Sequence, residues 1–401
     1  MADYSTRCCV VGGGPAGMML GYLLARAGID VIVLEKHEDF LRDFRGDTVH
    51  PSTMQVMYEL GLLDAFLARP HSEVRELAAQ IGDETIKLAD FSHLPTRAKF
   101  IAFMPQWDFL DFLAEQAQYF SSFHLLRRTE ATDLVRDGDR VVGVTANGPD
   151  GSHTIHAELV VACDGRHSTL REVSGFHVTE IGAPMDVLWL RLSKHANDPG
   201  QTFGHIDRNR FFIMLDRNDY WQCAFVIPKG GIDQVHARGL EAFRAEIVGL
   251  SPFLGDRVQE LATWDDVKLL TVAVNRLETW YQPGLLLIGD AAHAMSPVGG
   301  VGINLAIQDA VATANILVPR MKNGAATLDD LRAVQRRREW PSKMTQRMQV
   351  MIQNRVITGV LRSTETPKPP AVLRLIKHFP MLRRLPARVI GMGFRPEHIR
   401  H

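Results

Sequence analysis

The chain has 401 residues, with 45 Lys and Arg against 46 Asp and Glu, which gives a formal net charge of −1. Near neutrality excludes a global electrostatic attraction to nucleic acid, so no nucleic-acid partner is expected. A hydrophobic fraction of 46% with 23% charged residues excludes an intrinsically disordered chain. At this length, two domains with sizeable hydrophobic cores are expected.

The cysteines and the N-terminus predict a cytoplasmic protein. Cys8, Cys9, Cys163 and Cys223 lie among apolar residues and form no CxxC pair, which is typical of buried thiols in a reducing compartment. The N-terminal apolar stretch contains a triple glycine and a proline, which do not fit a signal-peptide core. No window of about 18 apolar residues occurs, so no membrane span is expected.

The first predicted elements form a strand–turn–helix–strand unit. An apolar strand at 7–11 precedes a helix over 15–27 that Gly28 caps, and a buried strand follows at 30–35. This order is typical of a parallel sheet with a right-handed crossover. Further elements are expected as helices at 52–67, 107–120, 238–262, 301–317 and 328–358, short strands and loops within 74–103, strands with a hairpin over 122–162, an antiparallel sheet over 184–228 and a buried strand at 285–289.

A glycine-rich string follows the first predicted strand and opens the first predicted helix. It fits G-x-G-x-x-G, in which one glycine allows a tight turn, one lets the backbone approach a pyrophosphate and one lets helix pack on strand. The helix N-terminus offers free N–H groups to phosphates, and a carboxylate ending the second strand can accept from ribose hydroxyls. The predicted dinucleotide contacts here are Gly12, Gly14, Pro15, Ala16, Gly17, Glu35 and Lys36.

Two further motifs each follow a predicted buried strand: CDGRHSTLR at 163–171 and GDAAHAMSPVGGVGIN at 289–304. Together with the first glycine motif, and in this order, they resemble the signature set of the class A FAD-dependent aromatic monooxygenases, the p-hydroxybenzoate hydroxylase-like family. The resemblance covers residues 5 to about 360. It implies an α/β fold with a Rossmann-like FAD-binding domain, an inserted antiparallel β-sheet substrate domain and a C-terminal helical tail.

The resemblance and the chemistry of the residues give the remaining FAD contacts. Asp290 can accept from ribityl hydroxyls, and glycine amides at the start of the 301–317 helix can stabilise negative charge on the reduced flavin. In RGDTVHP at 45–51, Arg45 is the predicted flavin contact and Arg42 its competitor. The other predicted contacts are Gln106, Asp164, Gly165, Gly289, Pro297, Gly300, Gly302, Ile303 and Asn304, and the predicted catalytic residues are Pro297, Gly299 and Gly300. His293 is interpreted as structural, and no metal-ligand spacing occurs.

The motifs bracket the antiparallel segment, so the second domain is predicted to be inserted into the first. The expected FAD-binding domain comprises 1–75, 99–180 and 268–360, the substrate domain 76–98 and 181–267, and the tail 361–401. Candidates for the substrate wall are Phe103, Trp189, Phe212, Met214 and Trp221. A register error of one residue would move any strand residue to the opposite face, which also leaves open the faces of Arg191, Arg210 and Gln222.

The resemblance implies two half-reactions. NADPH or NADH reduces FAD, and O2 then supplies one oxygen atom to a small aromatic or similar organic substrate through a flavin C4a-hydroperoxide. The choice of nicotinamide, and of monomer or homodimer, stays open. Alternatives are an FAD-dependent reductase of an isoprenoid-type double bond and a non-catalytic flavin-binding protein. Halogenases of this fold share W-x-W-x-I-P, and CAFVIP at 223–228 lacks both tryptophans.

The last forty-odd residues are strongly basic. From Val360 to His401 there are nine Lys and Arg against Glu365 and Glu397, interleaved with apolar residues. One hypothesis is a weak peripheral contact with a membrane. The other is a cap that packs on the FAD-binding domain and exposes a solvated basic face.

Overall fold

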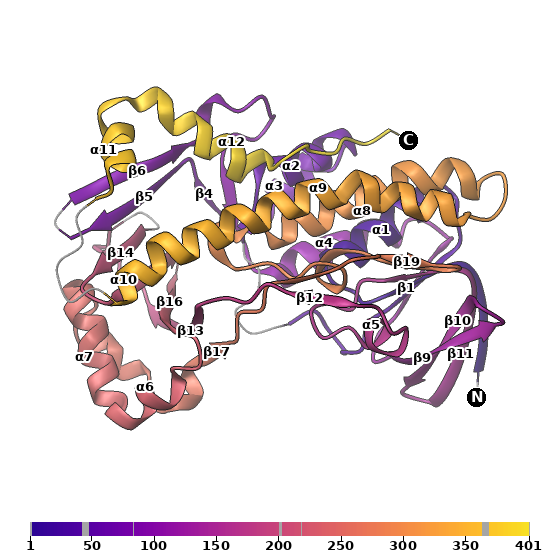
Figure 1. The fold of residues 1–401 in the computed structure, drawn as a ribbon, viewed down its shortest axis with the longest axis horizontal. Helices are drawn as coiled ribbons and strands as arrows, with labels where there is room; N and C mark the ends of the chain where they lie inside the picture. Colours follow the sequence, from indigo (N-terminus) through magenta and orange to yellow (C-terminus); the bar gives the residue numbers. More distant parts are fainter. Residues whose placement is uncertain are drawn as a thin grey trace.

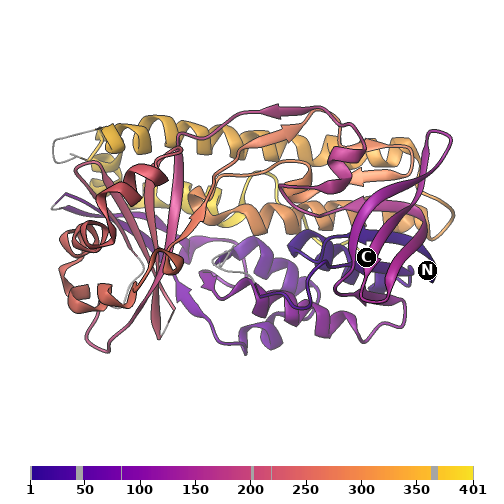
Figure 2. The same ribbon diagram turned by 90° about the horizontal axis from the view of Figure 1, so that it is seen from below.

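The computed structural model describes residues 2–41, 48–82, 84–199, 203–217, 219–362 and 369–400. Two large sheets lie at opposite ends of an elongated molecule, and two long helices, α8 (Gly302–Met321) and α9 (Leu328–Ile352), run along its length (Figures 1 and 2). Loops from the first sheet meet one face of the second between these two ends.

The first sheet has eight strands and a parallel centre. β20, β11, β1, β2 and β8 pair in parallel, as the predicted strand–helix–strand unit requires. Parallel pairs need helical crossovers, and α1 (Pro15–Arg26) packs against both α4 (Gln106–Ala117) and α8. The strand order is β19 (Tyr281–Gln282), β20 (Leu285–Leu287), β11 (Gly151–Ala162), β1 (Ala2–Val11), β2 (Val31–Leu34) and β8 (Phe123–Leu126), with β10 (Arg140–Gly148) and β9 (Glu130–Asp137) continuing from β11.

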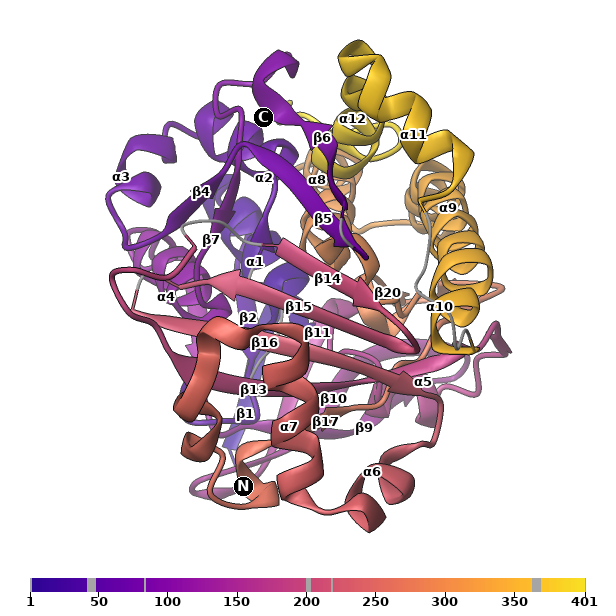
Figure 3. The same cartoon turned by 90° about the vertical axis from the view of Figure 1, so that its left-hand side faces the viewer.

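The second sheet has seven strands drawn from two distant parts of the chain. A parallel pair, β14 with β5, joins the hairpin of residues 76–90 to the strands of residues 185–270. Helices α6 (Ile232–Arg238) and α7 (Leu240–Leu250) cover one face, which is the near face in Figure 3. The strand order is β17 (Lys268–Leu270), β13 (Met185–Ser193), β16 (Tyr220–Pro228), β15 (Arg210–Asp216), β14 (Phe203–Asp207), β5 (Glu76–Ile81) and β6 (Glu84–Asp90).

Two small sheets lie where the chain passes between the large ones. One comprises β3 (Thr48–Val49), β7 (Ile101–Phe103) and β4 (Ser72–Val74), and the other pairs β12 (Val178–Glu180) with β18 (Asn275–Leu277). The short helices α2 (Pro51–Glu59), α3 (Leu63–Leu67) and α5 (Thr169–Val173) also belong to these connections.

The C-terminal region returns along the molecule. After α9, a π-helical turn at Gln353–Ile357 leads to α10 (Thr358–Arg362) beside the second sheet. Helices α11 (Ala371–His378) and α12 (Arg384–Met392) then pack on β6, at the edge of that sheet (Figure 3).

The predicted fold class is confirmed, and the differences are local. The helix expected over 52–67 is divided into α2 and α3 because Gly61 has φ +73°. The helix expected over 238–262 is α7 followed by a 3-10 segment, Pro252–Glu260, since Pro252 ends the α-helical pattern. The domain boundaries stay a prediction.

One segment, Val298–Met321, is long and apolar enough by composition to cross a membrane, with a mean hydropathy of 1.4. Of that window, 83% is buried inside the protein, which is the pattern of a core helix. It corresponds to α8 and the turn before it.

Candidate active site

The first glycine loop joins β1 to α1 and leaves one position open. Gly12 has φ +106°, and a Cβ there would lie 2.5 Å from the carbonyl oxygen of Cys163, while a Cβ at Gly17 would overlap the carbonyl oxygen of Gly12. At Gly14, no heavy atom of the described residues lies within 4 Å of the corresponding position. The loop is closed against the sheet and open at Gly14, where the backbone can approach a pyrophosphate.

Glu35 ends β2 and faces this loop. Its side chain is buried, and its Oε2 accepts from the Gly13 N–H at 3.1 Å while Oε1 accepts from the His37 N–H at 2.9 Å. These bonds fix a carboxylate beside the loop, as recognition of a ribose requires. Lys36 is exposed and lies 3.5 Å from Glu130, so its side chain turns toward a surface carboxylate.

The second glycine loop contacts the first. Pro15 and Ala16 begin α1, and a Cβ on Gly289, which has φ +62°, would lie 3.2 Å from the Ala16 Cβ. The N-cap of α1 is Gly14, which has no side chain to cap the helix, so the first N–H groups are left for a ligand. Asp290 follows Gly289 and is half-buried.

Asp164 follows β11, at the same edge of the sheet as the first loop. Its Oδ2 accepts from the Leu170 N–H at 3.2 Å, and its Oδ1 is buried with no hydrogen-bond partner among the described residues. Burial raises the pKa of Asp164. Gly165 has φ +86°, and none of the described residues has an atom within 4 Å of a Cβ built there. Arg171 donates to the Ala291 carbonyl at 3.3 Å. Arg171 therefore ties this motif to the Asp290 loop.

The loop from Pro297 to Gly300 is held against β3. Thr48 donates its hydroxyl to the Gly300 carbonyl at 2.8 Å, and a Cβ on Gly300 would lie 2.5 Å from that hydroxyl oxygen. Gly299 is exposed with φ +81°, and Pro297 is half-buried. A Cβ at Gly300 would displace the Thr48 hydroxyl, and φ +61° disfavours any residue with a side chain, which explains why glycine stands there.

The N-terminus of α8 carries a buried donor without an acceptor. Gly302 and Ile303 begin the helix, and the Asn304 Oδ1 accepts from the His50 N–H at 3.1 Å and from the Thr53 hydroxyl at 2.6 Å. The Asn304 Nδ2 is buried and has no partner among the described residues. An unmet buried donor costs about 1–3 kcal/mol, so this atom suits a bound acceptor.

The sequence analysis did not identify His50, although His50 lies in the segment 45–51 that supplied the prediction of Arg45 as a flavin contact. Its Nδ1 lies 2.8 Å from the Ile390 carbonyl, and burial lowers its pKa to about 4. His50 is therefore neutral at pH 7. Gln106 begins α4 and is half-buried, while Arg45 and its competitor Arg42 lie outside the described residues.

A buried ion-pair network supports the Asp290 loop. Asp309 on α8 accepts from the Gly289 N–H at 3.0 Å, lies 2.6 Å from the His293 Nε2 and accepts from the Arg338 Nε at 2.8 Å. Burial alone would raise the pKa of Asp309, but His293 and Arg338 against its oxygens hold it below the ordinary value. The structural interpretation of His293 fits this geometry. Asp309 and Arg338 were not predicted, because they lie inside helices and belong to no sequence motif.

The substrate-wall prediction is wrong at three of its five positions. Phe212, Met214 and Trp221 are fully buried in the core that the seven-stranded sheet forms with α7 and the following 3-10 segment. The Trp221 Nε1 donates to Asp198 at 2.8 Å, so its polar atom is used inside that core. These residues occupy the covered face because strand side chains alternate, and the register could not be read from the sequence.

The opposite face, here called the inner face, turns toward the Pro297 loop. Val298 of that loop packs in one cluster with Phe211 and Val226 of the inner face. Trp189 also lies on this face, and its Nε1 is buried without a partner among the described residues. Phe103, on β7, packs near Leu215 of the inner face.

The inner face also carries a buried polar pair, of which the sequence analysis named Gln222 but not Arg217. Gln222 accepts from the Arg217 Nε at 2.8 Å, and the Arg217 guanidinium lies 5.4 Å from the centre of the Phe103 ring. Arg191 instead stacks on Tyr220 at an exposed edge, and Arg210 pairs with Asp207. Arg217 lies in the β15–β16 turn, where no motif singled it out.

These observations fit FAD. The two glycine loops approach each other closely at Ala16 and Gly289, a fixed carboxylate faces the first loop, and buried polar atoms of Asp164 and Asn304 lack partners among the described residues. Such atoms and helix N-termini are what a dinucleotide with a flavin ring can satisfy. Among the described residues no group of three or more His, Cys, Asp or Glu could hold a metal ion.

Comparison with known proteins agrees with the geometry. The family model described as FAD binding domain matches residues 5–348. The chain is 32% identical over 386 residues to 6-methylpretetramide 4-monooxygenase of Streptomyces rimosus, covering 96% of this chain and 92% of that protein. It is 29% identical over 311 residues to rifampicin monooxygenase of Streptomyces venezuelae, covering 75% of this chain but 61% of that protein.

A solved structure shows the same fold. The p-nitrophenol 4-monooxygenase PnpA of Pseudomonas putida DLL-E4 superposes with a TM-score of 0.76 at 21% identity, covering 96% of this chain and 97% of that one. NAD(P)H is the reductant typical of this class. The chain belongs to the FAD-binding family of FAD-dependent aromatic monooxygenases.

Proposed function

We propose that this FAD-dependent monooxygenase hydroxylates a phenol-type aromatic compound, with NADPH or NADH as reductant and O2 as oxidant. The observation that carries the substrate site is the buried Trp189 Nε1, which has no acceptor among the described residues and lies on the inner face. A substrate oxygen would satisfy this donor. A donor of this kind favours an oxygen-bearing ring over a plain hydrocarbon.

FAD would supply the redox chemistry, and the chain supplies its position. In this proposal the open backbone at Gly14 and the N-terminus of α1 bind the pyrophosphate, and Glu35 accepts from a ribose. Asp290 accepts from the ribityl chain. The Gly300 and Gly302 amides and the Asn304 Nδ2 lie at the positive end of α8, where negative charge on a reduced ring is stabilised.

The substrate would lie between the inner face and the Pro297 loop. Trp189 and Phe103 form apolar walls, and the Arg217–Gln222 pair offers a polar group beside Phe103. The apolar surroundings would exclude water from the reacting ring, which limits the loss of oxidising equivalents as hydrogen peroxide. The similarity to a 6-methylpretetramide 4-monooxygenase over 92% of its length supports a fused-ring phenol as the substrate class.

The other candidate activities are not favoured. The two relatives described above are monooxygenases, which argues against a double-bond reductase and against a non-catalytic role. The strand at 223–228 lacks both tryptophans of the halogenase string.

A substrate screen tests the proposal. Oxidation of NADPH and NADH is followed with fused-ring phenols, simple phenols and aromatic acids, and hydrogen peroxide is measured in the same samples. A phenol that stimulates oxidation without a matching rise in peroxide supports the proposal. Stimulation by none of these classes would contradict it. For the cofactor, Asp290→Ala should lose FAD, and a folded variant with stoichiometric flavin would overturn the assignment of Asp290.

We also propose that the α11–α12 region contacts an anionic membrane surface from the cytoplasm. Its outward side exposes a row of large apolar side chains, although the inward side packs on β6. Arg374 and Arg388 lie on the same two helices, and neither forms an ion pair within the described residues, although Arg374, like Lys377, helps to lower the pKa of Glu84. The exposed apolar residues are Val372 (60%), Leu375 (49%), Phe379 (58%), Met381 (70%), Leu382 (38%) and Leu385 (68%).

Charge decides between a lipid surface and a second copy of the chain. Two copies meeting through this region would bring like charges together, whereas anionic lipid attracts them while the apolar row enters the interface. The protein should sediment with phosphatidylserine vesicles but not with phosphatidylcholine vesicles, and Met381→Glu with Leu385→Glu should abolish this. No sedimentation, or a dimer that these substitutions convert to monomer, would overturn it.

A further inference from the structure

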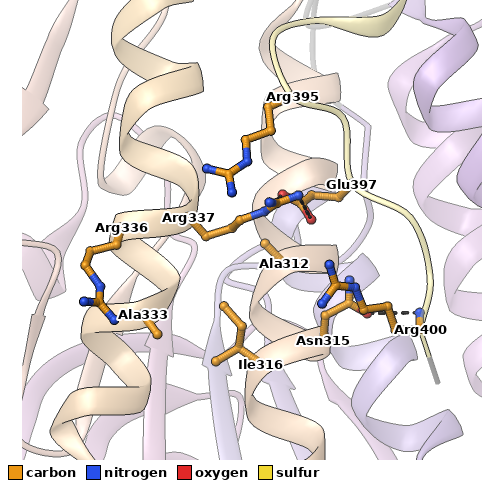
Figure 4. A pocket seen from close by; sticks show the side chains of 9 residues that line it. All are labelled: Ala312, Asn315, Ile316, Ala333, Arg336, Arg337, Arg395, Glu397 and Arg400. Atoms are coloured by element: carbon orange, nitrogen blue, oxygen red, sulfur yellow. Dashed lines mark hydrogen bonds and ion pairs between the residues drawn. The ribbon is translucent and has the colours of Figure 1, made fainter.

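A cavity of about 330 Å³ lies on the outer side of α8 and α9, beneath the extended chain that follows α12 (Figure 4). Neither the predicted FAD contacts nor the inner face contributes to it. Its lining combines a small apolar floor from the two helices with charged side chains from α9 and the chain end: Ala312, Asn315, Ile316, Ala333, Arg336, Arg337, Arg395, Glu397 and Arg400.

The chain end is fixed over the helices by a series of bonds. Glu397 is buried and forms two hydrogen bonds with Arg337, at 2.5 and 3.0 Å. Asn315 on α8 donates to the His398 carbonyl at 2.8 Å and accepts from the Arg400 N–H at 3.1 Å. The cavity is therefore part of the fold and not a gap beneath a loose terminus.

The backbone near the cavity is strained. Arg395 has φ +57°, a left-handed conformation that residues with a side chain rarely adopt. Its carbonyl accepts from Arg338 at 3.4 Å, which helps to hold this conformation. Strain of this kind persists only where surrounding structure determines it, and it clusters at functional positions. Here it places Arg395 on the rim of the cavity (Figure 4).

The cavity carries an excess of positive charge. Four arginines line it against one carboxylate, and that carboxylate, Glu397, is paired with Arg337. Arg336, Arg395 and Arg400 have no acidic partner among the described residues. Gathering like charges is unfavourable unless an anion binds them, and guanidinium groups match the geometry of phosphate oxygens.

We propose that this cavity binds a phosphate-bearing anion, at a site separate from the FAD and substrate sites. The shared chemistry is a phosphate-bearing anion that Arg336, Arg395 and Arg400 contact from different sides of the cavity, and it could come from free pyrophosphate or from a nucleotide. An aromatic pair lies nearby: Trp340, 52% exposed and one turn along α9 from Arg336, contacts Phe394 edge-to-face at 6.1 Å between ring centres. Trp340 offers a surface on which a base can stack.

Calorimetry on the FAD-loaded protein, with pyrophosphate and with AMP as probes, tests this site. We expect saturable binding that weakens as chloride is raised, because the contacts are charge-assisted. Arg400→Gln and Arg336→Gln should each weaken binding of the probe by about tenfold or more. Arg347→Gln is the matched control: Arg347 is exposed on α9 and does not line the cavity.

The outcomes separate the two sources and can refute the site. Tighter binding of AMP than of pyrophosphate, reduced by Trp340→Leu, supports a nucleotide. Equal or tighter binding of pyrophosphate, unaffected by Trp340→Leu, supports a free phosphate compound. Binding of neither probe at low salt would overturn the proposal, as would equal weakening by Arg347→Gln. Because binding is measured directly, this result does not depend on whether the proposed hydroxylation is correct.

Discussion

The glycine loops of the eight-stranded sheet and the strands of the seven-stranded sheet present their chemistry in opposite ways. In the loops the backbone is the surface that meets the ligand, and the space for a single Cβ decides whether a residue fits, as at Gly12 and Gly14. On the sheet, neighbours such as Phe211 and Phe212 point to opposite faces, so a ligand on one face meets only the side chains that point to it. A backbone site tolerates little substitution, whereas a side-chain site can change its ligand by single substitutions.

The largest expected effect comes from a pair of glycines in one loop. Gly12→Ala places a Cβ 2.5 Å from the Cys163 carbonyl oxygen in a left-handed conformation, so we expect loss of folded protein. In Gly14→Ala the new Cβ meets no atom of the described part of the chain within 4 Å, so the apoprotein should fold normally while FAD affinity falls by about a hundredfold. Circular dichroism and flavin titration measure the two effects. Equal flavin affinity in Gly14→Ala and the unmodified protein would contradict the claim that the backbone at Gly14 meets the cofactor.

Removing one member of the buried network should have the next largest effect. Arg338→Met removes the guanidinium group that lies 2.8 Å from the fully buried Asp309 carboxylate. We therefore expect a loss of about 3–5 kcal/mol in the free energy of unfolding. Denaturant titration measures it. Arg332→Met is the control, since Arg332 pairs with Asp329 on the surface and should cost under about 1 kcal/mol. Equal losses would show that the network does not support the loop.

Two tryptophans on the two faces of the seven-stranded sheet sharpen the comparison further. Trp221→Phe removes a donor to Asp198 inside the covered core, so it should cost about 1–3 kcal/mol of stability and leave KM unchanged. Trp189→Phe removes a donor that has no protein acceptor among the described residues, so stability should hold while KM rises by about tenfold. Thermal unfolding and steady-state kinetics with an identified substrate check both. The reverse pattern would mean that the faces are misassigned.

The smallest expected effect is an acid-range change in stability. The pKa of Asp309 is lower in the folded chain than its ordinary value of 3.8. Its contribution to the free energy of unfolding is therefore complete above pH 3.8 and is lost as the pH falls through the pKa of the folded state. Asp309→Asn should therefore flatten the fall of the melting temperature below about pH 4. An unchanged acid profile in Asp309→Asn would contradict the depressed pKa.

The same contrast explains what the sequence could predict. Gly12, Gly14 and Gly289 stand in motifs because the backbone conformation demands glycine, so their placement in touching loops followed from their order. Trp189 and Trp221 look alike in the sequence, since only register decides their faces. Asp309, Arg338 and Arg217 were missed because their partners come from elements far apart in the chain, and no local pattern marks a long-range ion pair.

Isotope labelling tests the central claim, monooxygenation at the junction of the two sheets, most directly. Turnover of an identified phenol with NAD(P)H under labelled O2 should give a product carrying one labelled oxygen atom, and labelled water should give none. A product without label, or consumption of NAD(P)H that ends entirely in hydrogen peroxide with every phenol, would contradict the account.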